Sequence, residues 1–299
     1  SWVERLENRR GPRGVVHVGM HKTGTSSIQD TFHGLNHRRI DYVTWDISNQ
    51  SPLFVLLFED EAKLSQYHMF KNRGPAFITG LAQERTRWME LLRNQVKAAR
   101  GKTVILSAED ITAPRFEAAC ERMHEFFSAL SDDVSAIGYA RSPKSFIESA
   151  FQQNLKGGTV INLDRRGLRP SYRARFEKID RIFGHANVTL KEFSRAKLLQ
   201  GDVVRDFAQL VGAGALRPEQ IAKSNERMSL ESTALLYVQR QFGSGLLSGF
   251  DASVGANNRF IGALSKIGQQ NFSLSDDWLA ALYMEIEKDV AWMESQSSD

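Results

Sequence analysis

The chain has 299 residues, which is enough for one large domain or two smaller ones. Its 41% hydrophobic and 25% charged residues are ordinary for a globular protein, and no apolar run approaches the length of a membrane-spanning helix. The formal net charge of +4 favours anionic ligands without requiring a nucleic acid.

The cysteine content points to a reducing compartment. Cys120 is the single cysteine, and one thiol cannot form an internal disulfide, so we expect a cytoplasmic protein. The small and apolar residues around Cys120 predict a buried, inert thiol on a helix face. The charged residues at positions 4–10 do not fit a signal peptide.

The first two-thirds of the chain alternate between short apolar runs and helical patterns. β-Branched residues predict strands, at residues 13–19, 40–45, 103–107, 134–140 and 188–193. Helical periodicity predicts helices between these strands, at residues 82–100, 114–130, 143–155 and 172–183. This alternation predicts an α/β fold with a mostly parallel central sheet between two layers of helices.

After residue 201 the strand pattern disappears. Further helices are expected at residues 203–211, 230–242, 260–267 and 276–293, whereas residues 243–258 are rich in Gly, Ser and Asn and predict a loop. We therefore expect a single domain, with an α/β core over residues 13–211 and a helical C-terminal portion over residues 212–299.

The loop after the first strand reads G-M-H-K-T-G-T-S-S over residues 19–27 and is followed at once by an amphipathic stretch. A strand, a Gly-rich loop and a helix surround an anion with backbone N–H groups and a helix N-terminus. The nucleoside-triphosphatase motif G-x-x-x-x-G-K-[ST] fails, because Thr25 stands in its lysine position and the lysine is Lys22. An ordinary tight turn is the alternative, but it does not require this combination of residues.

Polar residues follow two other predicted strands. Glu109 and Asp110 come after residues 103–107, and Arg141 comes after residues 134–140. Ligands of open parallel sheets bind beyond the carboxyl ends of the strands, so these residues fall where a nucleotide would bind. Arg141 and Ser149, two helical turns apart, supply a guanidinium fork and a hydroxyl, which together suit a phosphate.

The loop and the Arg141–Ser149 segment together resemble the sulfotransferases that use PAPS (3′-phosphoadenosine-5′-phosphosulfate), in particular bacterial, carbohydrate-type members. The resemblance covers about the first two-thirds of the chain, and His21 departs from the proline that is usual in the family. It implies a three-layer, P-loop NTPase-like sulfotransferase fold. It also implies a set of PAPS-binding residues, namely Lys22, Thr23, Gly24, Thr25, Ser26, Ser27, Arg141 and Ser149.

The activity implied by the resemblance is in-line transfer of a sulfuryl group from PAPS to a hydroxyl or an amine, most often of a carbohydrate. PAP (adenosine 3′,5′-bisphosphate) is then the product, and no metal takes part. Lys22 would stabilise the leaving phosphate, and Glu109 or His21 would remove the acceptor proton. Glu109 has an equally weighted structural interpretation, as a helix cap or an ion-pair partner.

The partners expected are therefore PAPS and a hydroxyl-bearing acceptor, and no nucleic acid. Six cations between Lys156 and Arg181 suggest an anionic glycan as acceptor, although a solvated basic surface is the favoured explanation. Two alternative functions stay open. One is a P-loop kinase that uses ATP and Mg²⁺, and the other is a non-catalytic protein that binds a nucleotide or a partner.

Overall fold

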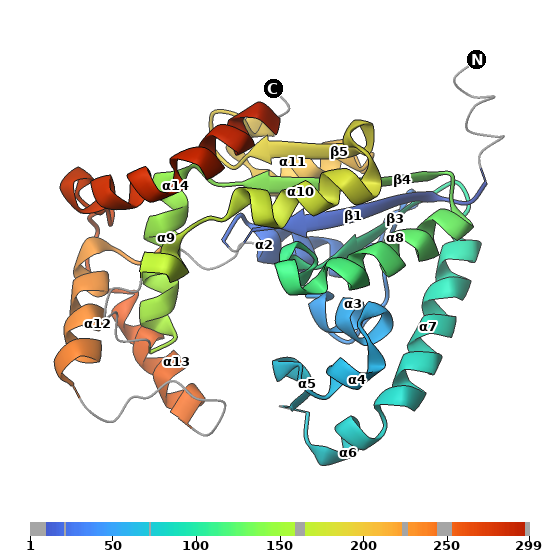
Figure 1. The fold of residues 1–299 in the computed structure, drawn as a ribbon, viewed down its shortest axis with the longest axis horizontal. Coiled ribbons are helices and arrows are strands. Elements are labelled where there is room, and N and C mark those ends of the chain that lie inside the picture. The colour runs from blue at the N-terminus through green and yellow to red at the C-terminus, as the bar shows by residue number, and fades with distance from the viewer. Residues whose placement is uncertain are drawn as a thin grey trace. The chain divides into compact units, whose positions relative to one another are not determined.

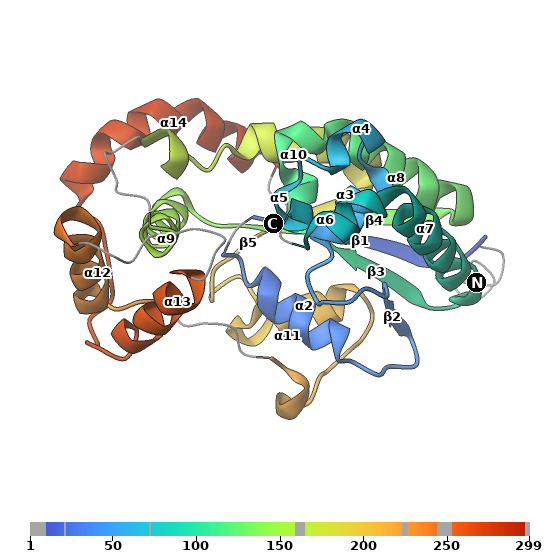
Figure 2. The same ribbon diagram turned by 90° about the horizontal axis from the view of Figure 1, so that it is seen from below.

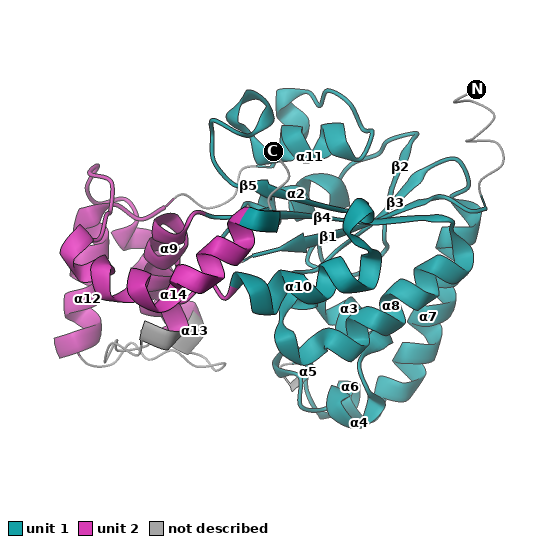
Figure 3. Ribbon diagram, turned by 45° about the horizontal axis from the view of Figure 1, so that its top comes forward, with its two compact units in different colours: residues 1–141, 172–224, 295–299 teal, residues 142–171, 225–294 magenta. Residues whose placement is uncertain are grey.

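The computed structural model describes residues 10–20, 22–71, 73–158, 165–222, 227–243 and 253–296. The chain divides into two compact units (Figure 3). Unit 1 comprises residues 1–141, 172–224 and 295–299, and unit 2 comprises residues 142–171 and 225–294. Unit 2 thus takes residues from both sides of position 211, and the expectation of a single domain stays a prediction.

Unit 1 is built on a parallel sheet whose described strands lie in the order β2-β3-β1-β4-β5. The strands are β1 (Arg13–Gly19), β2 (Ile40–Tyr42), β3 (Thr103–Ser107), β4 (Asp133–Ala140) and β5 (Val188–Glu192). In this register His17 of β1 lies opposite Ser107 of β3 and Ile137 of β4. The mostly parallel sheet predicted from the sequence is confirmed, with β2 ending three residues earlier than expected.

Burial explains why these runs form strands. All five residues of β3 are buried, and so are the last six of β1. Strands covered on both faces lose the polar alternation of half-exposed strands and show near-continuous apolar runs, as Val104–Ile105–Leu106 does here. Each such strand must therefore be covered by helices on both sides.

Helices cover the sheet on both faces, as Figures 1 and 2 show. On one face lie α2 (Thr25–His33) and α11 (Val203–Leu210), packed through a buried cluster that includes Phe32 and Phe207. On the other face lie α3 (Ser51–Phe58), α7 (Leu81–Ala98), α8 (Glu117–Leu130) and α10 (Tyr172–Phe183). The three-layer α/β architecture expected for the core is confirmed in unit 1.

Several short helices between β2 and α7 had no sequence prediction. They are α3, α4 (Glu61–Leu64), α5 (His68–Lys71) and α6 (Pro75–Thr79). Every residue of α3 is buried, so its sequence SPLFVLLF carries no polar face and gives no helical period to detect. Pro52 in its first turn is the one local signal that favours a helix start.

The described part of unit 2 is helical. It holds α9 (Pro143–Lys156), a 3₁₀ turn at Arg165–Leu168, α12 (Leu230–Phe242), α13 (Ser253–Leu264) and most of α14 (Asp276–Gln296). Ile147, Phe151 and Leu155 of α9 form its core, together with apolar residues of α12, α13 and α14. The helical C-terminal portion predicted from the sequence is confirmed.

The predicted loop at residues 243–258 is wrong over its last part, because α13 begins at residue 253 rather than 260. Asn257, a residue type that favours loops, is buried within this helix. Its side-chain oxygen accepts a hydrogen bond from Arg240, and its amide donates to the carbonyl of Lys156 at 3.0 Å. Tertiary hydrogen bonds thus hold a helix that local propensity does not predict.

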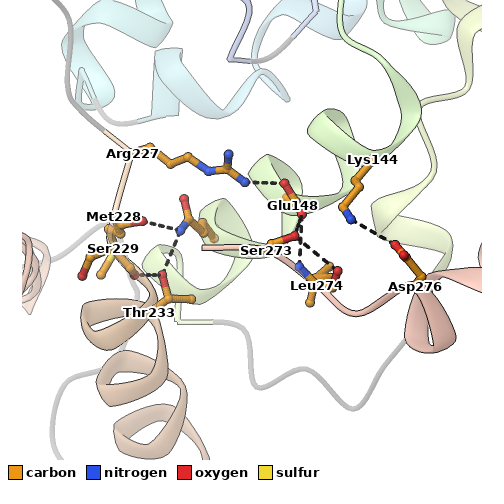
Figure 4. A network of polar contacts seen from close by, with 10 residues as sticks. Lys144, Glu148, Arg227, Met228, Ser229, Thr233, Ser273, Leu274 and Asp276 are labelled. Atoms are coloured by element: carbon orange, nitrogen blue, oxygen red, sulfur yellow. Dashed lines mark hydrogen bonds and ion pairs between the residues drawn. The ribbon is translucent and has the colours of Figure 1, made fainter. Parts of the chain in front are cut away.

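A polar stripe on α9 joins the segments of unit 2 (Figure 4). Glu148, which is buried, accepts hydrogen bonds from Arg227 at 2.5 Å, from the Ser273 hydroxyl at 2.9 Å and from the Leu274 N–H at 3.1 Å. One turn later, Gln152 donates to the carbonyl of Met228 and to the Thr233 hydroxyl. The stripe thus binds two segments that are far apart in sequence, residues 227–233 and 273–274, to the same helix. Such hydrogen bonds favour one arrangement of the segments against α9.

The substitution Glu148→Gln should therefore weaken unit 2. It removes the charge that Arg227 pairs with and places an amide donor against that guanidinium, so we expect a loss of about 1–3 kcal/mol in local stability. Native-state hydrogen exchange of the α12 amides measures this loss. Lys144→Ala on the same helix is the control, because its ion pair with Asp276 is exposed. An equal effect of both substitutions would contradict the central place of Glu148.

Candidate functional site

The strand order of unit 1 predicts a ligand site at the carboxyl ends of β1 and β4. β1 and β4 are neighbours, but the connection from β1 leads to β2 on one side, and the connection from β4 leads to β5 on the other. Connections that diverge from neighbouring strands leave a crevice at their carboxyl ends, and this crevice is where open α/β sheets bind ligands. The loop after β1 and Arg141 after β4 both lie there.

The loop after β1 turns tightly on the carbonyl of Met20. The Thr23 hydroxyl donates to this oxygen at 2.8 Å, and the Thr23 N–H points to it at 3.4 Å. Lys22, which lies between Met20 and Thr23 in the chain, has a φ of 66°. This left-handed conformation is energetically unfavourable for any residue other than glycine. Its side chain is exposed. The turn thus buries Thr23 and presents the lysine to solvent.

Glycine is required at both ends of this loop for steric reasons. A Cβ at Gly19 would lie 2.4 Å from the Thr25 hydroxyl oxygen. A Cβ at Gly24 would lie 2.5 Å from Cγ1 of Val203, and Gly24 has a φ of 74°. The spacing of the two glycines therefore reflects close packing of the loop, in addition to any ligand that it binds.

Helix α2 begins directly after Gly24 without a side-chain cap. The first N–H groups of a helix have no acceptor within the helix, and a glycine N-cap has no side chain to offer one. Of the hydroxyl residues in this turn, Thr25 is buried, Ser26 is exposed and Ser27 is half-buried. The N-terminus of α2 thus combines backbone donors with hydroxyls, which is a suitable environment for an anion.

Glu109 lies beside this loop. It begins a 3₁₀ turn, η1 (Glu109–Thr112), immediately after β3, and it is half-buried. The Thr112 hydroxyl donates to the carbonyl of Gly19 at 3.2 Å and to that of Glu109 at 3.0 Å. The structure therefore brings the Glu109 turn to the end of β1, as the strand-end argument predicted.

Arg141 follows β4 directly, at the same edge of the sheet as the loop after β1. Its Nε–H donates to the carbonyl of Lys22 at 2.5 Å, and its guanidinium carbon lies 4.8 Å from the centre of the Phe193 ring. The Tyr172 hydroxyl donates to the Arg141 carbonyl at 2.5 Å. Arg141 thus contacts the backbone of the loop that carries Lys22, 119 residues earlier in the chain.

His17 supports the loop from within the sheet. It is fully buried on β1, its Nδ1 lies 2.7 Å from the Ser107 hydroxyl, and its ring lies 4.9 Å from that of Phe207. Burial lowers the pKa of His17 from 6.5 to about 4, and the negative charge of Glu109 opposes this shift in part. His17 is thus a packed, hydrogen-bonded histidine.

The placement of two other predicted site residues beside this group stays a prediction. Ser149 is half-buried on α9 and belongs to unit 2, so its pairing with Arg141 stays a prediction. His21 lies outside the described residues, and with it the choice between His21 and Glu109 as the base. Cys120 is buried, and burial raises the pKa of its thiol to about 12, as expected of an inert cysteine.

Three arginines of the basic stretch between Lys156 and Arg181 pair with acidic residues. Arg169 pairs with Glu285 at 2.5 Å, Arg173 pairs with Glu177, and Arg181 pairs with Glu117 and Glu121. The side chains of Arg165 and Arg166 lie outside the described residues. Cations that already hold carboxylates favour a structural role, and an anionic acceptor stays a prediction.

Sequence reasoning did not identify three residues that shape the site, namely Thr112, Tyr172 and Phe193. Each acts through a contact with a distant segment: Thr112 with Gly19, and the other two with Arg141. A hydroxyl or a ring near a strand end is common in any α/β protein. No local signal could therefore have separated these three from ordinary core residues.

No family model matches the chain, and no curated protein matches it. Two similar solved structures are a sulfotransferase domain from the curacin biosynthetic pathway (11% identity, 86% of this chain and 98% of that chain, TM-score 0.43) and a sulfotransferase from Alicyclobacillus acidocaldarius (15%, 86% and 97%, 0.44). A gluconokinase from Sinorhizobium meliloti 1021 is also similar (12%, 69% and 97%, 0.31). These likenesses concern the fold, and the activity has to be argued from the residues of this chain.

Two further observations concern the described residues only. No helix among them is both long enough and apolar enough to cross a membrane. No group of three or more His, Cys, Asp or Glu side chains among them could hold a metal ion. Chemistry without a metal and a cytoplasmic location both stay predictions.

The buried His17 predicts a specific loss of stability in acid. Its folded pKa of about 4 lies below the unfolded value of 6.5, so the unfolded chain binds a proton that the folded chain does not. As the pH falls from about 6.5 to about 4, this group should remove about 3 kcal/mol of stability. Chemical unfolding at a series of pH values measures the loss.

The substitution His17→Gln keeps a hydrogen-bonding group opposite Ser107 but removes the titration, so its stability should fall less steeply over this pH range. His33→Gln, at an exposed position of α2, is the control and should follow the wild-type curve. Parallel curves for wild type and His17→Gln would show that His17 does not carry this pH dependence.

Proposed function

We propose that the protein is a PAPS-dependent sulfotransferase. The observation that carries the proposal is the hydrogen bond from Arg141 to the carbonyl of Lys22, which joins a second cation to a phosphate-type loop at the switch point of the sheet. Two separate cations at one edge suit a nucleotide with phosphate groups at two positions. The motif itself resembles that of sulfotransferases, because the lysine precedes the second glycine instead of following it.

The roles that we propose follow the geometry of the loop. The backbone N–H groups at the start of α2, with the hydroxyls of residues 25–27, would bind the 5′-phosphosulfate. Lys22, exposed on the loop, would neutralise the charge that develops on the leaving phosphate. Arg141 and Ser149 would bind the 3′-phosphate, which distinguishes PAPS from ATP.

The reaction that we propose is an in-line displacement at sulfur. The acceptor oxygen forms a bond to sulfur while the bond from sulfur to the bridging oxygen breaks, and PAP leaves with the electron pair. Glu109, next to the end of β1, would take the proton from the acceptor hydroxyl. A carbohydrate hydroxyl is the acceptor that we propose, because the segment around Glu109 resembles that of carbohydrate-type sulfotransferases.

PAP should stabilise the protein in the absence of any metal. A ligand that binds only the folded state, at one hundred times its Kd, adds about 2.7 kcal/mol of stability, which raises the Tm by about 5 °C in a chain of this size. Lys22→Ala removes a charge-assisted hydrogen bond to the phosphate and should raise the Kd for PAP roughly ten- to a hundredfold. Thermal melting at a series of PAP concentrations measures both effects.

Lys63→Ala, at an exposed position of α4, is the matched control and should leave the PAP response unchanged. Stabilisation by ATP with Mg²⁺ and none by PAP would contradict the sulfotransferase proposal and support the kinase alternative. Stabilisation by PAP without transfer of labelled sulfate from PAPS to any of a panel of sugars would support a non-catalytic, nucleotide-binding protein.

Glu109→Gln should separate catalysis from binding. Removing a general base lowers kcat by about 10²- to 10⁴-fold, whereas the PAP-induced rise in Tm should persist. Asp110→Asn, on the same turn, is the control, since the Asp110 carboxylate is occupied by the Tyr67 hydroxyl at 2.6 Å. Retained activity in Glu109→Gln together with lost activity in His21→Gln would assign the base to His21.

A further inference from the structure

We propose that Phe193 is a positioning residue that orients Arg141 toward the 3′-phosphate and so sets the preference for nucleotides that carry this group. The inference rests on the proposed function of the site. Phe193 follows β5 directly, and its N–H donates to the carbonyl of Ala140 at 2.7 Å, one residue before Arg141. The aromatic ring and the arginine therefore leave the sheet side by side from neighbouring strands.

The Phe193 ring holds the guanidinium by one face. The guanidinium carbon of Arg141 lies 4.8 Å from the ring centre, within the range of a cation–π contact. The Arg141 Nε–H is directed to the carbonyl of Lys22. A planar group that is fixed by its face and by its Nε–H has little rotational freedom left, so its two terminal nitrogens point in a defined direction.

The same ring also contacts the phosphate loop. A Cβ placed on Gly24 would lie 3.2 Å from Cε2 of Phe193, so the ring packs against the backbone of the loop just before α2 begins. Phe193 is partly buried and also packs against the buried cluster that includes Phe32 of α2 and Phe207 of α11. A side chain packed against this core is a firm support for both the arginine and the loop.

This support has a consequence for affinity. A free arginine loses the freedom of several rotatable bonds when it binds phosphate, and an arginine already held in place loses less. Phe193 should therefore strengthen binding of nucleotides with a 3′-phosphate and leave nucleotides without one unaffected. A ring that merely filled space beside Gly24 would affect both kinds of nucleotide alike.

The test compares PAP with AMP (adenosine 5′-monophosphate), which lacks the 3′-phosphate. Phe193→Leu keeps an apolar side chain against Gly24 but removes the aromatic face, and Phe193→Tyr keeps the face. Calorimetry should show that Phe193→Leu weakens PAP binding about three- to tenfold while AMP binding changes less than twofold. Phe193→Tyr should restore the wild-type ratio of the two affinities.

Two controls make the result specific. Phe183→Leu, a buried aromatic residue of α10 that contacts His124, should lower stability without changing the ratio. In an Arg141→Ala background, Phe193→Leu should cause no further loss of PAP affinity, because the ring acts through the arginine. Equal losses of PAP and AMP binding in Phe193→Leu, or a further loss in the Arg141→Ala background, would overturn the inference.

A measurement on the free protein separates this inference from the proposed function. The Nε–H group of Arg141 should be ordered on the nanosecond timescale by NMR relaxation, and Phe193→Leu should lower its order parameter. An unchanged order parameter would overturn the positioning role of Phe193. Failure of the wild-type protein to bind PAP would overturn the proposed function, with the NMR result still deciding whether Phe193 holds Arg141.

Discussion

The hydrogen bond from the Arg141 Nε–H to the Lys22 carbonyl joins the ends of two strands whose connections run in opposite directions. In doubly wound sheets such a divergence leaves a crevice beyond the carboxyl ends of the two strands. The crevice is polar because loops and helix termini surround it. Here the loop that fills it makes a strained turn at Lys22, and Thr112 holds the preceding carbonyl of Gly19 from the other side. The backbone at Lys22, the Glu109 turn and Arg141 are therefore held together at the ends of β1, β3 and β4.

The layer beneath the loop is what makes this arrangement rigid. His17, Ser107 and Gln29 are buried polar residues in a core of aliphatic and aromatic side chains, and they form hydrogen bonds among themselves. Gln50 extends the group, since its oxygen accepts a hydrogen bond from the Ser107 N–H at 2.7 Å. Buried polar groups are costly unless they are paired, so the hydrogen bonds of His17 Nδ1, Ser107 and Gln29 favour this register of β1 against β3 and α2, whereas His17 Nε2 has no partner among the described residues. The loop begins at Gly19, two residues after His17, so the same hydrogen bonds hold the strand just before the loop.

The chain departs from unit 1 after Arg141 and returns at Tyr172, where the hydroxyl of Tyr172 binds the carbonyl of Arg141. Arg141 and Tyr172, which flank the inserted residues 142–171, are therefore held together at the candidate site. Within unit 2, α9 follows Arg141 directly, and its polar stripe is bound on several sides through Glu148 and Gln152. Ser149, the residue after Glu148, thus lies on a helix whose own position in unit 2 is tightly fixed.

The sequence by itself determined the α/β class, the five strands and most of the long helices, because burial on both faces of a strand and on one face of a helix leaves a regular apolar pattern. It also placed Lys22, Glu109 and Arg141 at strand ends, which is a consequence of chain order alone. Local pattern could not give α3, whose residues are all buried, or the start of α13, where Asn257 is held by Arg240.

Only the tertiary structure decided which strand ends are neighbours, and therefore that the Lys22 loop, Glu109 and Arg141 meet at one edge. It alone revealed Phe193, Thr112 and Tyr172, whose contacts join segments that are far apart in the chain. The physical reason is the same for all three. A hydrophobic period reports how deeply a residue is buried but not which residue it touches, whereas a binding site is made of contacts between residues that are distant in sequence.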